Sequence, residues 1–228
     1  MQVDEVLEHL RSLANPANVA GMARFAINPD RTLGIDIPTL RKLARRIGAD
    51  HTLALQLWGS GIHEARILAS YIADPHQLSE AQVEQWVAEF DSWDVCDQVA
   101  DLFAKTPFAY PKIAEWAQRP ETFVKRAAFA LITEITTHDK QASDEQLAQF
   151  FPIIVRASDD DRNFVKKAVN WALRSLGKRN RALNEQAIAT ARQIQALGTR
   201  PARWIAADAL RELTSAKVQA RFERITAN

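Results

Sequence analysis

Apolar residues recur with the helical period along nearly the whole chain, and this feature most restricts the possible folds. They are spaced three and four residues apart, which places an apolar stripe on one face of each segment. Alternating Val/Ile/Thr-rich segments bounded by hairpin turns are absent from the sequence. We therefore predict an all-α protein, with helices at about 3–14, 17–26, 38–47, 51–58, 63–73, 79–90, 91–104, 109–118, 121–136, 143–156, 161–178, 183–197, 201–213 and 215–225.

A weak internal repeat relates segments about 40 residues apart. FVKRAAFAL (123–131) aligns with FVKKAVNWAL (164–173), and ALRSL (172–176) aligns with ALREL (209–213). Helix pairs at this spacing are typical of HEAT-like solenoids, in which each pair buries its apolar face against its neighbours. We expect a HEAT-like α-α superhelix. Because no Gly-, Ser- or Pro-rich linker divides the chain, residues 1–228 are expected to form a single domain.

Composition excludes several other classes of protein. The chain has no apolar run long enough to span a bilayer, and acidic residues stand where a signal peptide carries bases, so a cytoplasmic protein without membrane contact is expected. The single cysteine, Cys96, excludes an internal disulfide and a Cys-rich zinc site. The pair His63-Glu64 lacks the second histidine of a zinc-protease motif, and there is no Walker loop or G-x-G-x-x-G. We expect no metal and no cofactor.

The net charge is only +1, but the basic residues are unevenly distributed. Three aspartates, 159–161, directly precede a stretch with seven bases and no acid: Arg162, Lys166, Lys167, Arg174, Lys178, Arg179 and Arg181. Acids at a helix start and bases along its body also complement the helix dipole. A solvated helix face and a surface for an anionic partner therefore both remain open.

Three predicted helices carry unusual residues opposite their apolar stripes. In 91–104 the stripe contains Val95, Val99, Leu102 and Phe103, whereas Trp93 and Asp97 lie together with Ala100 on the other face. In 121–136 the residues opposite the stripe are Arg126, Ala130 and Thr133, and in 161–178 they are Lys167, Trp171, Arg174 and Lys178.

Bases separated by small residues on a concave solenoid suit a phosphate backbone, and aromatic side chains can contact a base or sugar. Double-stranded DNA is therefore the expected ligand of a basic concave face. The alternative is that inner helices pack on two sides, which makes Trp93 and Trp171 core residues. Asp97 likewise can belong to a negatively charged surface stripe with Asp91, Asp94 and Asp101.

Several blocks of the sequence resemble the AlkD-like DNA glycosylases, also called DNA alkylation repair enzymes. The similarity spans nearly the whole chain and includes GMARF (21–25), LGI with Pro38 and Arg41, SWDVCDQV (92–99), KRAAFAL (125–131) and VKKAVNWALR (165–174). By this resemblance Asp97 corresponds to the catalytic aspartate, Trp93 and Trp171 to lesion-contacting tryptophans, and Arg126 and Arg174 to arginines facing the DNA backbone. Lys167 and Lys178 are added on charge and facing alone. Ser92 departs from the better-known form, which has a second tryptophan there, and Cys96 and Trp204 are not expected from the family.

The resemblance implies a monofunctional glycosylase that hydrolyses the N-glycosidic bond of purines alkylated at N3 or N7 in duplex DNA and initiates base excision repair. It also implies that the lesion is not inserted into a tight pocket. A monomer is expected. The alternatives are a non-catalytic HEAT-like protein that binds damaged or branched DNA, and a protein-binding scaffold. Salt-sensitive affinity indicates DNA, whereas a salt-independent apolar interface indicates a protein partner.

Overall fold

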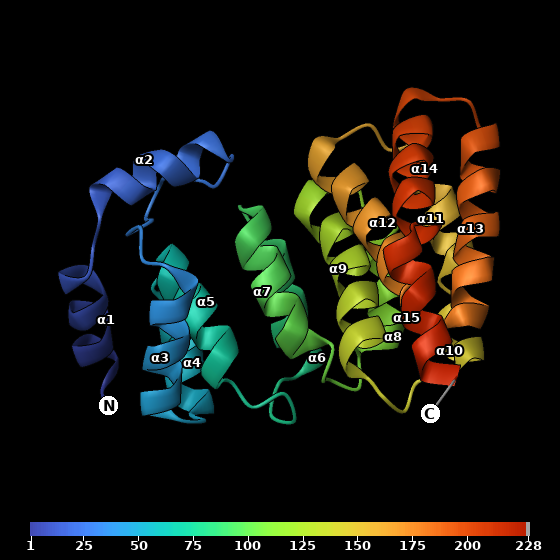
Figure 1. The fold of residues 1–228 in the computed structure, drawn as a ribbon. Coiled ribbons are helices and arrows are strands. Elements are labelled where there is room, and N and C mark those ends of the chain that lie inside the picture. Colours follow the sequence, from blue (N-terminus) through green and yellow to red (C-terminus); the bar gives the residue numbers. More distant parts are fainter. Residues whose placement is uncertain (227–228) are drawn as a thin grey trace. The chain divides into compact units, whose positions relative to one another are not determined.

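A computed structural model describes the backbone of residues 1–226 and the side chains of residues 1–223. All regular structure in this part of the chain is helical (Figure 1), which confirms the predicted all-α class. None of the described helices is both long and apolar enough to cross a membrane. The chain divides into two compact units, the first ending at Ala109 and the second beginning at Tyr110. The single domain over residues 1–228 stays a prediction.

The first unit is organised around α5, which packs against α3, α4 and α7. Its core includes Trp58 of α4 and Trp86 of α6, whose rings are parallel with centroids 4.0 Å apart. These two tryptophans are therefore core residues, unlike Trp93. The helices of this unit are α1 (Val3–Ser12), α2 (Pro16–Arg24), α3 (Ile37–Ile47), α4 (His51–Gly59), α5 (His63–Ile72), α6 (Glu80–Ala88) and α7 (Trp93–Phe103).

The second unit is organised around α12, which packs against both α9 and α14. Equivalent positions of the sequence repeat meet here, because the rings of Phe123 and Phe164 lie 5.4 Å apart between centroids. This contact is the one expected of stacked helical repeats. The helices are α8 (Ala109–Trp116), which begins at the unit boundary, α9 (Thr122–His138), α10 (Asp144–Ala148), α11 (Phe151–Ala157), α12 (Asn163–Leu176), α13 (Arg181–Ala196), α14 (Arg200–Leu213) and α15 (Ala216–Thr226).

The apolar stripe predicted for α7 is confirmed, because Val95, Val99, Leu102 and Phe103 are all buried. The faces opposite the apolar stripes are more buried than expected. Ala100, Ala130 and Thr133 were predicted to separate surface residues, yet all three are buried. A helix in a stacked row can be covered on more than one side, as α12 is by α9 and α14.

The helix predicted over 143–156 is wrong in one respect, because the structure contains two shorter helices, α10 and α11. Pro152 in the first turn of α11 has no N–H for the carbonyl of Ala148, and its ring clashes with that carbonyl in a continuous helix. Helix α10 accordingly ends at Ala148. Other predicted helix starts are confirmed: Ser79 and Ser143 form capping boxes with Gln82 and Gln146, and Pro38 lies in the first turn of α3.

Candidate functional site

The first turn of α7 carries Trp93, and Asp97 follows one turn later on the same helix. Both side chains are partly exposed. In contrast, Val95, which lies between them in the sequence, and Val99, which follows Asp97, are buried. The indole Nε1 of Trp93 donates a hydrogen bond of 3.0 Å to the carbonyl of Phe25. This bond orients the indole ring.

Trp93 forms one wall of an apolar pocket in the first unit. The pocket has a volume of about 510 Å³, and Phe25 at its edge is 73% exposed. Its lining comes from α2, from the segment between α2 and α3, and from Trp93: Ala17, Asn18, Gly21, Met22, Phe25, Ile27, Gly34, Ile35, Asp36 and Trp93. An apolar surface of this kind favours the flat face of a base or sugar over a phosphate.

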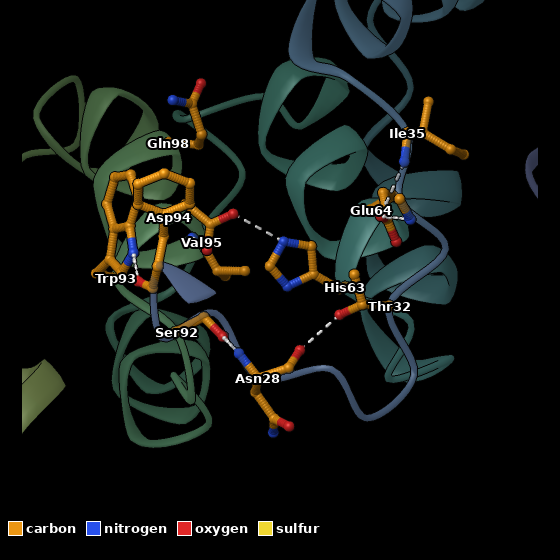
Figure 2. Close-up of polar contacts among 12 residues, drawn as sticks. Asn28, Thr32, Ile35, His63, Glu64, Ser92, Trp93, Asp94, Val95 and Gln98 are labelled. Atoms are coloured by element: carbon orange, nitrogen blue, oxygen red, sulfur yellow. Dashed lines mark hydrogen bonds and ion pairs between the residues drawn. The ribbon is translucent and has the colours of Figure 1, made fainter. Parts of the chain in front are cut away.

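The segment between α2 and α3 is fastened to α5 by Glu64. This carboxylate is completely buried and accepts three backbone N–H bonds, from Leu33 at 2.8 Å, Gly34 at 2.7 Å and Ile35 at 3.2 Å. A buried carboxylate with such partners is stabilised by charge-assisted hydrogen bonds. Figure 2 shows Glu64 facing this segment from the start of α5. Glu64 therefore holds two residues of the pocket wall, Gly34 and Ile35.

The same segment is fastened to α7 by Ser92. Its buried hydroxyl oxygen accepts the N–H of Asn28 at 2.9 Å, and the Asn28 side chain donates to Asp91 at 2.9 Å. The Ser92 hydroxyl thus bonds a distant segment rather than the N–H groups of its own helix. This contact gives Ser92 a structural role.

A buried ion pair joins α5 to the first turn of α7. His63 Nε2 lies 2.9 Å from Asp94 Oδ2, and the two side chains are 3% and 13% exposed (Figure 2). Burial lowers the pKa of His63, but the hydrogen bond to Asp94 and the charges of Asp94, Glu64 and Asp91 outweigh it. The net effect is a pKa raised above the ordinary 6.5. Protonated His63 therefore stabilises the helix turn that carries Trp93.

Because of this pair, we expect the free energy of unfolding to decrease as the pH rises. The folded state binds the His63 proton more tightly than the unfolded state, so the stabilisation is complete below pH 6.5 and is lost as the pH rises through the raised pKa. Urea unfolding between about pH 6 and pH 9 measures the slope of the free energy of unfolding against pH. His63→Gln is expected to flatten it, whereas the exposed control His76→Gln is not. An unchanged slope in His63→Gln contradicts this assignment.

In the second unit, Trp171 of α12 is partly exposed and lines a pocket of about 530 Å³. Arg126 of α9, predicted to face DNA, is only 6% exposed. Its Nη1 donates a bond of 2.7 Å to the carbonyl of Phe164 at the start of α12. Arg126 thus joins two stacked helices, and little of its surface is left for a phosphate.

The other predicted DNA contacts differ in their partners. Lys167 is exposed. Arg174 and Lys178 both pair with Glu212 of α14, at 2.5 and 2.9 Å, and the Nε atom of Arg174 lies 3.6 Å from Asp208. Glu212 and Asp208 both belong to α14, which packs against α12. A phosphate that approaches Arg174 therefore competes with carboxylates already in place.

Part of the basic stretch is neutralised by the aspartates that precede it. Asp160 accepts hydrogen bonds from Arg162 and lies 3.0 Å from Lys125 of α9. Burial raises the pKa of Asp160, but Arg162 and Lys125 outweigh burial and hold this pKa at about 2. The aspartates before the basic stretch suggested complementarity to the helix dipole. In the structure, one of them, Asp160, also forms a local cluster of ion pairs with Arg162 and Lys125.

The structure brings Trp93 and Asp97 together on α7 in the first unit, and it brings Trp171, Arg174 and Lys178 together on and after α12 in the second. Sequence reasoning missed the roles of His63, Glu64 and Ser92. It examined His63-Glu64 only as a metal motif. The available signal was that two ionisable residues begin the apolar helix HEARILASYI, where burial demands partners.

Comparison with known proteins now identifies relatives of this chain. The sequence matches a model of the DNA alkylation repair enzymes over residues 6–213. The fold is similar to a solved structure from a new family of proteins related to the HEAT-like repeat DNA glycosylases with affinity for branched DNA structures. The TM-score is 0.74 at 19% identity, and the match covers 84% of this chain and 83% of that one. This likeness confirms the HEAT-like fold. None of the curated proteins matches the chain.

Proposed function

The chain belongs to the DNA alkylation repair enzyme family, and from this premise we propose that it is a DNA glycosylase acting on purines alkylated at N3 or N7 in duplex DNA. The observation that carries the proposal is the pairing of Trp93 with Asp97, one turn apart on α7 and both partly exposed. An aromatic face and a carboxylate at this spacing can contact one nucleotide together.

The chemistry requires little beyond a carboxylate. An N3- or N7-alkylpurine is cationic, so the bond between C1′ of the sugar and the base breaks with its electron pair passing to the purine. Positive charge then develops on the sugar. Asp97 stabilises this charge and orients the water whose oxygen adds to C1′ and whose proton is released. The products are a free base and an abasic site.

The two tryptophans are proposed to contact the cationic nucleotide and its sugar. Cation–π contacts contribute about 0.5–2 kcal/mol each, and they strengthen as charge develops on the sugar. The hydrogen bond between Trp93 and Phe25 supports this role, because a fixed ring loses little freedom when a ligand binds. We propose Trp171 for the same role from the second unit.

Four bases are proposed to serve the DNA backbone, but their environments differ. Lys167 is exposed and can reach a phosphate directly. Arg174 and Lys178 must exchange Glu212 for phosphate, which weakens their contribution. Arg126 is proposed to act mainly by holding α9 against α12, since its guanidinium bonds the carbonyl of Phe164.

A second candidate function is binding of branched DNA without catalysis. The observation in its favour is the fold shared with a relative that has this affinity. The pairing of Trp93 with Asp97 argues against it, because a carboxylate among the ligand contacts repels phosphates and serves no purpose in a protein that only binds.

The proposed function is tested by incubating the wild-type protein with methylated duplex DNA at low salt and quantifying free bases by chromatography. We expect release of alkylated purines and strands that break only after alkaline treatment, since the chain offers no lysine placed as a nucleophile by its family resemblance. Tight, salt-sensitive binding of branched DNA without base release contradicts the glycosylase and supports the second candidate.

A further inference from the structure

The pocket beside Trp171 contains a group of cations, of which the proposed function uses only Lys178. It lies within the second unit and has a volume of about 530 Å³, in the range of small-ligand sites. Besides Trp171, four basic residues line it: Lys140, Lys178, Arg179 and Arg221. They come from different places, after α9, after α12 and from α15. Basic side chains from separate elements therefore converge on one cavity.

The charge of this cavity is strongly positive. Glu134 is the one carboxylate among the lining residues, and His138 lies 3.3 Å from it. Lys178 also pairs with Glu212, which lies outside the lining. Apart from His138, four cations face one lining acid. An anion entering this cavity is attracted by these charges, two of which, Lys178 and Arg179, are partly buried.

The alternative role of these cations is to cap helix α9. Arg179 donates to the carbonyls of Thr136 and Asp139, at 3.1 and 2.9 Å, and Lys140 donates to the carbonyl of Thr137. Capping explains why these two side chains lie there, but it uses only part of their capacity, because a guanidinium has five N–H donors and an ammonium three. It does not account for Arg221, which belongs to another helix. The bonds to the carbonyls also hold Arg179 rigidly in place.

The aromatic wall indicates what kind of anion fits. Trp171 lines the same cavity, together with the hydroxyl-bearing residues Thr133, Thr136, Thr137 and Ser175. An indole ring suits a sugar or base, and arginine and lysine suit a phosphate. A nucleotide unit has both parts.

We propose that this cavity binds a backbone phosphate of a DNA strand whose sugar or base lies against Trp171. The inference rests on the proposed function in taking DNA as the ligand, and it adds Lys140, Arg179 and Arg221 to the DNA-binding residues. The cavity then holds the strand through contacts that are independent of base identity.

The test uses the paired variant Lys140→Gln/Arg221→Gln, which removes two charges and keeps polar side chains of similar length. Its affinity for an unmodified duplex is measured against salt concentration. Arg192→Gln, an exposed arginine of α13 outside the cavity, is the control. We expect the paired variant to bind about fivefold more weakly at low salt, with a salt slope smaller by about one to two, and the control to match the wild type.

Thermal unfolding of both variants separates lost binding from lost folding, and a weaker affinity at an unchanged melting temperature supports the phosphate cavity. Equal affinities and salt slopes in the paired variant and the control overturn it. Base release by the wild type is measured separately. Absence of release by the wild type contradicts the proposed function alone, because the comparison of DNA affinities does not depend on catalysis.

Discussion

Asp97→Asn is expected to slow the release of alkylated purines by at least about a hundredfold, with DNA affinity within about twofold of the wild type. Asparagine has nearly the same shape as aspartate but carries no charge. It therefore removes the stabilisation of the developing positive charge on the sugar and leaves helix α7 intact. Because neutralising an acid near DNA also relieves repulsion, any change in affinity is expected to be an increase.

The measurement is single-turnover base release at saturating protein, which separates chemistry from binding. Asp101→Asn is the matched control, because Asp101 lies one turn further along α7 and forms a surface pair with Lys105 at 2.7 Å. It undergoes the same change in charge and is expected to retain the wild-type rate. Equal rates for the wild type and Asp97→Asn rule out the catalytic assignment of Asp97.

Glu64→Gln is expected to lower the free energy of unfolding by roughly 3 kcal/mol. The wild-type carboxylate accepts three backbone N–H bonds in a fully buried position. A glutamine offers one oxygen acceptor and places an NH2 group against N–H donors, so that at least one buried N–H loses its partner. The loss is larger than for a surface acid because water cannot replace the missing bonds.

Urea unfolding at neutral pH measures this effect, with Glu8→Gln, at an exposed position of α1, as the control for the change in charge. A second consequence can be read from the same variant. The charge of Glu64 is one of the causes that raise the pKa of His63, so Glu64→Gln is expected to lower that pKa. A stability equal to that of the control contradicts the role of Glu64 in holding the segment between α2 and α3.

Helix positions, apolar stripes and helix starts were predictable because they depend on local spacing and on capping chemistry. Val165, Val169 and Leu173 recur with the helical period, and Ser79 with Gln82 forms its capping box within four residues. The break before α11 was predictable in principle, since Pro152 prevents a continuous helix. It was missed because the apolar period continues across the break.

The candidate site was predictable in part. The periodicity placed Trp93, Asp97 and Trp171 away from the main apolar stripes, and all three are partly exposed. The same reasoning did not anticipate that the side chain of Arg126 reaches α12 and is buried there. A helical period reports the direction of a residue from its own axis, but it contains no information about the helix that lies in that direction.

The sequence by itself therefore determined the helices, the repeat and the family, because each depends on residue types at fixed separations along the chain. Only the tertiary structure decided which polar residues meet. Glu64 contacts residues about 30 positions away, Asn28 bonds Ser92, and cations from three separate segments line the cavity beside Trp171. Such contacts form because buried charges and N–H groups require partners wherever the packing brings them, and the packing is set by the whole chain.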